Sequence, residues 1–398
     1  MSNFCPLPWN HLFVRANQNV FPCCNTNMVY SEFDETIEKT ANAEVFNKFR
    51  REFLDNPNKL PKACWQCEVI EKTNNKSLRQ RATSAFPKLN LEVAQRMTKI
   101  NGSVRNFKLE RLDIRSSNLC NYKCRFCGIV SSNSWLKDHK ALGHEVNDAY
   151  DAKTGISEFN LPWEDLKTHL PYVKQVKLAG GEPVMMAGTY QLLEELIAIG
   201  NTDTTINLIT NASVITYGKK NIIDLLKKFK RVVIMLSIDA IGLQHEWLRS
   251  GKQDWPKVKG IIDEYTSICK QNNMSLTFHT GVTWMNMWHL EKFIKEYPTH
   301  RFIFNTVTEP KIYSLTNYDR KQVEKAEKHY NNLYRITNNS RYRDVYKILT
   351  VTRQENMNEV FDKQEFIRTT TILDKSRNQS FTKTFPILSE ILIGNKLV

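Results

Sequence analysis

The stretch NLCNYKCRFC, residues 118–127, decides how the rest of this chain is interpreted. Its cysteines, Cys120, Cys124 and Cys127, have the spacing C-x3-C-x2-C and follow a predicted strand at 109–115. Three thiolates on one short loop can ligate three irons of a cubane cluster while backbone N–H groups donate to the sulfurs. No fourth cysteine is close by in the sequence, so one iron would have no protein ligand and could bind a small molecule. Catalytic zinc sites likewise keep one coordination position free of protein ligands. A zinc site is the alternative that this spacing leaves open.

Around this loop, apolar β-branched runs alternate with helical patterns. The predicted strands cover residues 109–115, 175–179, 205–209, 231–238, 276–282 and 301–307, and the predicted helices cover 163–169, 188–199, 219–229, 256–272 and 288–296. Six strands that alternate with helices predict an α/β fold with a parallel sheet, open or curled into part of a barrel. The chemistry of such folds lies at the carboxyl ends of the strands. After Pro310 the pattern becomes helical and charged.

Polar residues follow three more of these strands. Gly180-Gly181-Glu182-Pro183 ends the second strand, Asn211 follows the third, and Ser237-Ile238-Asp239 ends the fourth. The two glycines permit a sharp turn that brings the Glu182 carboxylate close to an ammonium group. Asp239 can accept hydrogen bonds from a pair of ribose hydroxyls. A single strand-end acid is more often a helix cap or a surface group, but here such residues recur in register with successive strands.

These features resemble the radical S-adenosylmethionine (SAM) enzymes, whose hallmark is C-x3-C-x-aromatic-C, with Phe126 as the aromatic residue here. The resemblance covers residues 107–307 and implies a partial (β/α)6 TIM-like barrel. It implies that the three cysteines hold a catalytic [4Fe–4S] cluster. The SAM-binding residues that it implies are Phe126, Gly180, Gly181, Glu182, Asn211, Ser237, Asp239 and Arg249. Residues 279–284 match the family only loosely, so the adenine contacts stay open.

The resemblance also implies an activity. SAM binds the open iron, and one electron from the reduced cluster, supplied by a donor such as a flavodoxin or ferredoxin, cleaves its C–S bond. The resulting 5′-deoxyadenosyl radical removes a hydrogen atom from a substrate. In such enzymes the cofactors carry the hard chemistry, while the protein supplies ligation, orientation and the exclusion of water.

A second set of cysteines precedes this core. Cys5, Cys23, Cys64 and Cys67 can close a four-coordinate site, with Cys24 as a spare or competing ligand, and the spacing fits either zinc or an iron–sulfur cluster. Beside a radical SAM core, the segment resembles the twitch or SPASM modules that hold an auxiliary [4Fe–4S] cluster. It departs from them in two ways, since Gln18 stands where a glycine is usual and the module precedes the barrel.

Composition limits the remaining possibilities. The chain has 398 residues, 41% of them hydrophobic, and carries 56 Lys+Arg against 42 Asp+Glu, a net charge of +14. No apolar run is long enough to span a membrane, and the first residues do not resemble a secretory signal. We therefore expect a cytoplasmic protein whose nine cysteines serve as metal ligands rather than disulfides. The expected domains are a cluster module at 1–70, a basic helical linker at 71–106, the radical SAM core at 107–307 and a helical region at 308–398.

The substrate is the least determined feature. Residues 72–125 contain 13 Lys+Arg and 3 Asp+Glu, which indicates either a solvated face or a docking surface for an anionic chain. Together with the charged carboxy-terminal helices, this basic segment favours a peptide or protein substrate over a nucleotide, RNA or small metabolite. The alternative of a different class is a non-catalytic, zinc-stabilised nucleic-acid-binding protein. That alternative leaves the strand-end residues Glu182, Ser237 and Asp239 unexplained.

Overall fold

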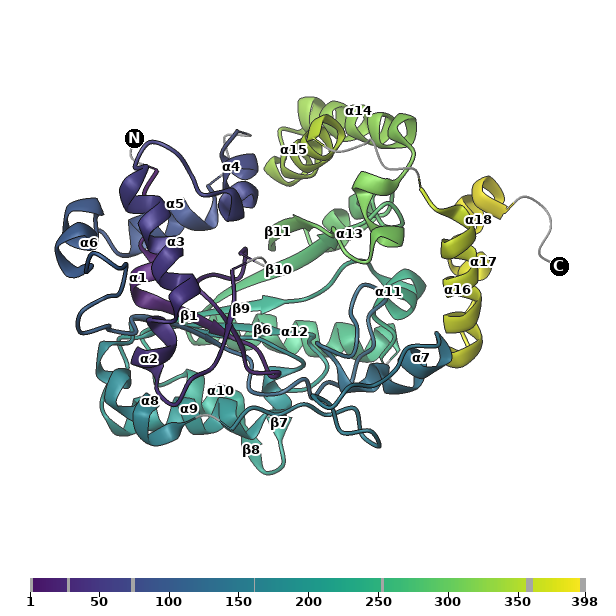
Figure 1. The fold of residues 1–398 in the computed structure, drawn as a ribbon. Coiled ribbons are helices and arrows are strands. Elements are labelled where there is room, and N and C mark those ends of the chain that lie inside the picture. The colour runs from purple at the N-terminus through teal and green to yellow at the C-terminus, as the bar shows by residue number, and fades with distance from the viewer. Residues whose placement is uncertain are drawn as a thin grey trace. The chain divides into compact units, whose positions relative to one another are not determined.

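The computed structural model describes residues 3–26, 29–72, 76–160, 162–251, 254–355 and 361–393 of the chain (Figure 1). Two units are distinguished. The first unit comprises Met1–Ser117, Ser157–Leu208 and Thr216–Val232, and the second comprises Asn118–Ile156, Ile209–Ile215 and Val233–Val398. The amino-terminal cysteines therefore belong to the first unit and the cysteine loop at 118–127 to the second.

The first unit is built on a mostly parallel sheet. Its strands lie in the order β6-β5-β4-β1-β2-β3, where β1 is His11–Val14, β2 Asn19–Phe21, β3 Ser31–Glu32, β4 Arg111–Ile114, β5 Gln175–Leu178 and β6 Thr205–Thr210. Strands β1, β4, β5 and β6 pair in parallel, while β2 and β3 add an antiparallel edge. Leu112 of β4 lies between Leu12 of β1 and Val176 of β5. The amino-terminal module thus extends the sheet directly.

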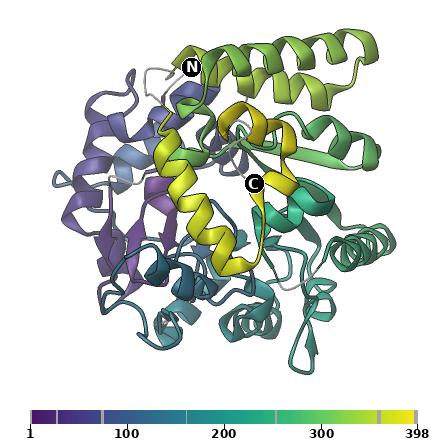
Figure 2. The same ribbon diagram turned by 90° about the vertical axis from the view of Figure 1, so that its right-hand side faces the viewer.

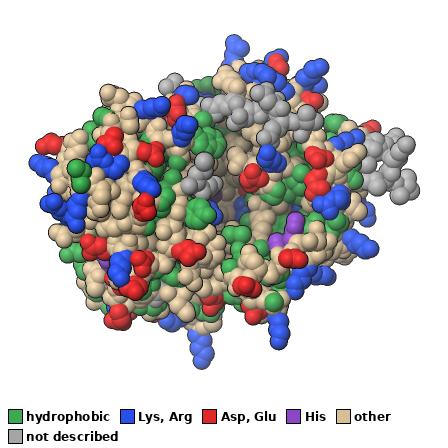
Figure 3. All heavy atoms as spheres, viewed as in Figure 1, with side chains coloured by type: hydrophobic (Ala, Val, Ile, Leu, Met, Phe, Trp, Pro, Cys, Tyr) green, Lys and Arg blue, Asp and Glu red, His purple; other side chains and the backbone are tan. Residues whose placement is uncertain are grey.

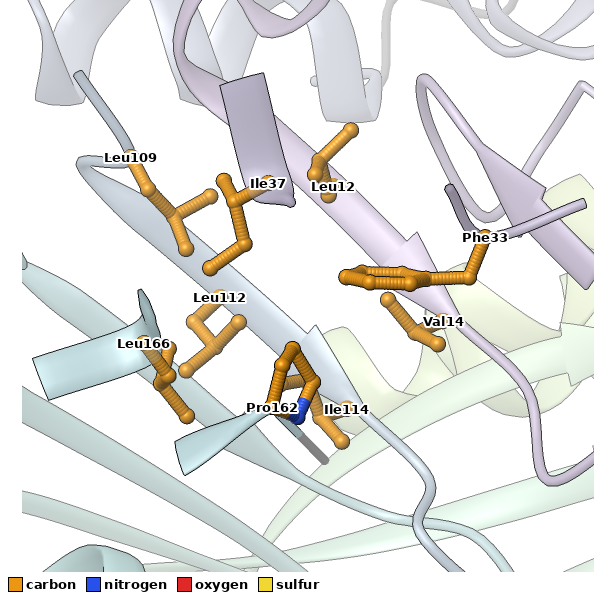
Figure 4. A pocket seen from close by; sticks show the side chains of 9 residues that line it. All are labelled: Leu12, Val14, Phe33, Ile37, Leu109, Leu112, Ile114, Pro162 and Leu166. Carbon is orange, nitrogen blue, oxygen red and sulfur yellow. The ribbon is translucent and has the colours of Figure 1, made fainter. Parts of the chain in front are cut away.

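One face of this sheet is apolar and shares a core with the amino-terminal module. Alternate residues of a strand point to the same face, and Leu12, Val14, Leu112 and Ile114 line one apolar pocket. Figure 4 shows Phe33 and Ile37 of the amino-terminal module directed into the same space as Leu112 and Leu166. Shared burial of this kind joins the two segments of chain into one hydrophobic core.

Short helices complete the first unit. They are α1 (Leu7–Asn10), α2 (Ile37–Ala41), α3 (Glu44–Asp55), α4 (Trp65–Lys72), α5 (Leu78–Ala85), α6 (Leu91–Met97), α8 (Trp163–His169), α9 (Ala187–Ala198) and α10 (Ile222–Leu226), with the hairpin β7 (Thr216–Tyr217) and β8 (Lys220–Asn221). Helix α3 buries Phe46, Phe49 and Phe53, whose spacing places them on one face. Its buried Arg50 donates to the carbonyls of Gly102 and Pro8, at 2.8 and 2.9 Å.

The second unit contains the remaining parallel strands. These are β9 (Arg231–Leu236), β10 (Ser275–Val282) and β11 (Arg301–Thr306), with helices α7 (Leu136–Ala141), α11 (Gly242–Arg249), α12 (Trp255–Gln271) and α13 (Leu290–Glu296). Phe278 of β10 lies between Leu236 and Phe302 of its neighbours. These three strands carry the second unit's strand-end residues, including Ser237 and Asp239.

The carboxy-terminal region of the second unit is helical. Its helices are α14 (Arg320–Thr337), α15 (Ser340–Glu355), α16 (Lys363–Arg377), α17 (Phe381–Thr384) and α18 (Pro386–Ile393), and α14 and α15 lie side by side (Figure 2). Trp284, which follows β10, stacks on Tyr318 with ring centroids 4.6 Å apart, and Phe366 of α16 contacts its edge. These helices therefore share a core with the end of β10.

The predicted fold class is confirmed as a mixed α/β architecture with a mostly parallel sheet, consistent with a partial barrel. All six predicted strands and all five predicted helices occur in the expected places. Before residue 70, β1, β2 and β3 are also part of the sheet, and no strand was predicted there from the sequence. Among the described residues, no helix is both long and apolar enough to cross a membrane. The expected basic linker includes residues 73–75, which lie outside the described residues.

Candidate metal centres

The cysteine loop of the second unit presents its thiols to hydrogen-bond donors. Cys120 Sγ lies 3.4 Å from the backbone N of Tyr122 and 3.8 Å from Asn211 Nδ2. Cys124 Sγ lies 3.7 Å from Arg249 Nη1. Donors directed at sulfur stabilise the thiolate, which is the form that ligates metals.

Hydrogen bonds from the segment that follows hold this loop in shape. Asn133 Oδ1 accepts from the backbone N of Cys120 at 2.9 Å, and Ser134 Oγ donates to the Cys120 carbonyl at 2.7 Å. Trp135 Nε1 donates to the Cys124 carbonyl at 3.0 Å. The sequence motif gives no sign of these three supports, because their side chains act on the backbone of the cysteines rather than on the sulfurs.

The thiols of the loop also share one electrostatic environment. A hydrogen bond from Cys127 and, to a smaller extent, the Arg249 guanidinium together lower the pKa of Cys124 to about 7, against the effect of burial. The same hydrogen bond, together with burial, raises the pKa of Cys127. Among the described residues, no three His, Cys, Asp or Glu side chains converge on a single metal ion. Cys120, Cys124 and Tyr122 nevertheless form one buried cluster, and the partly buried Cys127 and Phe126 pack against it. A multi-iron group ligated by thiolates fits this donor set.

The strand-end residues of the second unit meet at this loop. Asp239 is fully buried and accepts from Arg249 Nε at 2.5 Å and from the backbone N of Gly281 at 2.7 Å. The Arg249 guanidinium also lies 5.5 Å from the Phe126 ring centroid. Burial opposes the charge of Arg249, but Asp239 and Cys124 together raise its pKa. Arg249 is therefore a fixed cation between a thiolate and a carboxylate.

Two further predicted residues of the second unit, Asn211 and Ser237, are also buried. Asn211 Nδ2 also donates to Asn121 Oδ1 at 2.9 Å, so this side chain contacts the cysteine loop twice. Ser237 is 8% exposed, and its backbone N donates to the Thr210 carbonyl at 2.8 Å. The structure thus brings Phe126, Asn211, Asp239 and Arg249 together with the cysteines, while the role of Ser237 stays a prediction.

The predicted Gly-Gly-Glu-Pro turn lies in the first unit. Gly180 has φ +134°, and a Cβ there would stand 3.2 Å from the Ser117 carbonyl oxygen, so only glycine fits without strain. Glu182 is fully buried and accepts from the backbone N of Val184 at 3.2 Å. Burial and the charge of Glu182 raise the pKa of Tyr190 to about 12. The contacts of Gly180, Gly181 and Glu182 with SAM stay predictions.

The four amino-terminal cysteines predicted as ligands line one cavity in the first unit. Cys5, Cys23, Cys64 and Cys67 are each at most 9% exposed and surround this cavity together with Phe49, Phe53 and Arg79. Burial raises the pKa of Cys5 to about 12, and burial next to Cys5 and Cys67 raises the pKa of Cys64. Such thiols resist ionisation unless a cation is present, so the donor set fits a metal cluster.

Cys24 differs from its four neighbours. It does not line the cavity, and a hydrogen bond from Cys23 lowers its pKa to about 6, with Lys177 and Arg115 adding to this effect. The backbone N of Asn25 donates to Cys23 Sγ at 3.2 Å. Cys23 rather than Cys24 therefore completes the group around the cavity.

Two family models match this sequence. One, described as the radical SAM superfamily, matches residues 114–296, and the other, the SPASM iron–sulfur cluster-binding domain, matches residues 5–68. No curated protein matches the chain.

Several solved structures are also similar to this chain. A hexahistidine-tagged form of anSMEcpe with bound AdoMet is 18% identical, with a TM-score of 0.39. The match covers 57% of this chain and 58% of that chain, which is less than two thirds of that protein. Streptococcus suis SuiB bound to its precursor peptide SuiA is 16% identical with a TM-score of 0.39, over 84% of this chain and 70% of that one. TsrM, a radical S-adenosylmethionine methyltransferase from Kitasatospora setae, is 13% identical with a TM-score of 0.35, over 52% and 39%.

Proposed function

Because the chain belongs to the radical SAM superfamily and carries an amino-terminal SPASM module, we propose that the loop of Cys120, Cys124 and Cys127 holds its catalytic [4Fe–4S] cluster. The observation that carries this proposal is the position of Arg249, which contacts Cys124, Asp239 and Phe126 at once. It supplies a buried positive charge beside the thiolates, where the carboxylate of SAM can be held.

The remaining residues have supporting roles in this proposal. The three thiolates ligate the cluster, and the donors on Cys120 and Cys124 stabilise their charge. Asp239 orients Arg249 and offers oxygens to the ribose. When bound, the cluster and SAM supply one-electron cleavage of SAM to a 5′-deoxyadenosyl radical, which removes hydrogen from the substrate. A flavodoxin or ferredoxin is the proposed electron donor.

The amino-terminal cavity is proposed to hold an auxiliary [4Fe–4S] cluster on Cys5, Cys23, Cys64 and Cys67. The support is that these four thiols line one cavity while Cys24 lies outside it. Such a cluster would tie Cys5, Cys23, Cys64 and Cys67 together and so stabilise the amino-terminal module. About four irons should remain in the Cys120/Cys124/Cys127→Ala triple variant; zinc in place of iron would contradict this assignment.

The activity is tested by anaerobic reconstitution with iron, sulfide and SAM, followed by dithionite. The protein should produce 5′-deoxyadenosine even without substrate, and Cys124→Ala should abolish this product. Cys269→Ala is the matched control, because this buried thiol of α12 lies outside both groups of cysteines. If the wild-type protein does not form 5′-deoxyadenosine, the proposed function is wrong.

For the substrate, we propose an acidic segment of a peptide or protein. The support is that eight cations of the basic segment are exposed, namely Lys72, Lys76, Arg81, Lys88, Arg96, Lys99, Arg105 and Lys108. Over the face shown in Figure 3, cations and anions are interspersed, so the proposal rests on this segment rather than on the overall charge. Arg79 is not available for docking because it is buried and donates to Glu71 Oε1 at 2.9 Å.

This substrate class can be tested with a defined probe. Fluorescein-labelled polyglutamate should bind the wild-type protein in a salt-dependent manner, and Lys76→Glu, Arg81→Glu and Lys88→Glu together should weaken that binding. Reversal of Lys257, Lys270 and Lys292, which are exposed in the second unit, is the control. Tighter binding of an RNA oligonucleotide of equal charge would favour the nucleotide or RNA alternative.

A further inference from the structure

Helix α16, which lies outside the segment matched by the radical SAM family model, reaches the cysteine loop through Asp374. One oxygen of this carboxylate accepts from Arg125 Nη2 and, at 2.9 Å, from Trp247 Nε1. The other oxygen accepts from the backbone N of Phe381 at 2.6 Å. A single side chain therefore joins the cysteine loop, helix α11 and helix α17.

Arg125 depends on these contacts because it is fully buried. It stands between Cys124 and Phe126 in the motif, and its guanidinium lies 3.9 Å from the Trp247 ring centroid. Its Nη2 also donates to Gln379 Oε1 at 2.9 Å, and its backbone N donates to the Leu248 carbonyl at 2.7 Å. A buried guanidinium needs an anionic partner, and the partner here comes from α16 rather than from the loop.

A second connection runs parallel to the first, through the fully buried Asp138 of α7. Its Oδ2 accepts from Arg377 Nε at 3.1 Å and pairs with Lys123 Nζ at 3.4 Å, while its Oδ1 accepts from Ser376 Oγ at 2.6 Å. Arg377 Nη1 also donates to Ser250 Oγ at 2.9 Å, just after the end of α11. The residues on either side of Cys124, Lys123 and Arg125, are therefore both tied to α16.

These contacts matter because α11 carries Arg249. The distance from Arg249 to Cys124 depends on how α11 lies against the loop. Asp374 contacts both elements directly, and Arg377 contacts Ser250 at the end of α11 and Asp138, which pairs with Lys123 of the loop. Resting on the proposed function, we propose that Asp374 and Arg377 are positioning residues, and that α16 is a strap that fixes the cluster loop and the Arg249 helix in register. Neither residue touches the reacting groups, so both act through Arg125, Trp247, Asp138 and Ser250.

The electrostatic balance of the strap supports this role. The ion pairs that join α16 to the loop and to α7 involve three cations, Lys123, Arg125 and Arg377, but only two carboxylates, Asp138 and Asp374. Loss of Asp374 leaves the Arg125 charge without its carboxylate, so the loop must move to find water or another anion.

The strap is tested on the full-length, reconstituted protein with Asp374→Asn, which keeps the shape of the side chain and removes its charge. Asp344→Asn is the matched control, because Asp344 pairs with Arg343 on the exposed face of α15. Gln379→Ala is the milder variant, which removes one contact to Arg125 and decides the question if Asp374→Asn does not fold. Two quantities are measured under anaerobic conditions. These are the rate of iron loss to a chelator, and the SAM concentration that half-saturates the change in the electron paramagnetic resonance (EPR) spectrum of the reduced protein.

Asp374→Asn should release loop iron about tenfold faster and require about tenfold more SAM, since removal of one partner of a buried ion pair is strongly destabilising. Gln379→Ala should show smaller shifts in the same direction, and Asp344→Asn none. A purely structural role would lower the unfolding temperature without changing the SAM dependence of the spectrum. If a folded variant shows a rate of iron loss and a SAM dependence within twofold of wild type, the proposed positioning role of α16 is wrong. A wild-type protein whose EPR spectrum does not respond to SAM would instead overturn the proposed function.

Discussion

The ion pair between Asp239 and Arg249 should couple two fully or nearly buried side chains strongly enough to be measured in a double-mutant cycle. The two groups are 2.5 Å apart at 0% and 10% side-chain exposure. Unit charges at 4 Å interact by about 4 kcal/mol at an effective dielectric of about 20, and breaking a buried pair costs about 3–5 kcal/mol. Asp239 keeps one further donor, Gly281 N, so we expect the lower end of this range, about 3 kcal/mol, for Arg249→Met.

The double variant Arg249→Met/Asp239→Asn should lose much less stability than the sum of the two single variants, with a coupling of at least about 2 kcal/mol. Unfolding of the metal-free protein in urea can be followed by tryptophan fluorescence, because Trp247 is buried in the same unit. The exposed pair Arg343–Asp344 is the control and should show a coupling of about 0–1 kcal/mol. A coupling for Asp239–Arg249 no larger than this control would refute the reasoning that places a fixed cation beside Cys124.

Three further outcomes are expected. Gly180→Ala should lower the free energy of unfolding by about 1–3 kcal/mol, because a φ of +134° is strained for alanine. Gly200→Ala, which has open space around it at φ +74°, should lower the unfolding temperature less. Burial lowers the pKa of His245 from 6.5 to about 3, so the unfolded chain binds more protons than the folded chain between these pH values. The free energy of unfolding should therefore fall as the pH drops from 6.5 to 3, and His245→Leu should reduce that fall in denaturation series measured at several pH values. Cys23→Ser should lose auxiliary iron while Cys24→Ser retains it, and the opposite result in iron counting would exchange their roles.

The radical SAM core could be predicted from local signals. Strands β4, β5, β6, β9, β10 and β11 overlap the six runs predicted from the sequence, and predicted site residues come soon after β5, β6 and β9. Such signals lie within a few residues of one another, so periodicity and motif spacing suffice to place them.

The amino-terminal strands could not be predicted in the same way. All four residues of β1 are buried, so it shows no alternation, and β2 and β3 have only three and two residues. β1 is held by pairing with β4, and β2 and β3 are added to β1 in turn. The apolar contacts of Phe33 and Ile37 with Leu112 also join residues far apart in the chain. The role of Arg79 was missed for a similar reason. A run of basic residues indicates an exposed face, but the pairing with Glu71 and the Phe4 carbonyl buries this one.

The strap was also invisible in the sequence. Arg125 is a charged residue inside a buried motif, which signals a missing partner, but Asp374 is 249 residues away. Composition and spacing carry no information on contacts at that separation. The domain boundaries, the cytoplasmic location and the contacts of Ser237 and Glu182 with SAM stay predictions.

The central claim is that the three cysteines of the loop hold a cluster that binds SAM. The most direct measurement is EPR spectroscopy of the reduced Cys64→Ala/Cys67→Ala variant, in which the loop cluster is the one expected to remain, with and without SAM labelled with ¹⁷O in its carboxylate. We expect a reduced [4Fe–4S] signal that changes when SAM is added and shows hyperfine coupling to ¹⁷O. A signal that does not respond to SAM, or no iron–sulfur signal at all, would contradict it.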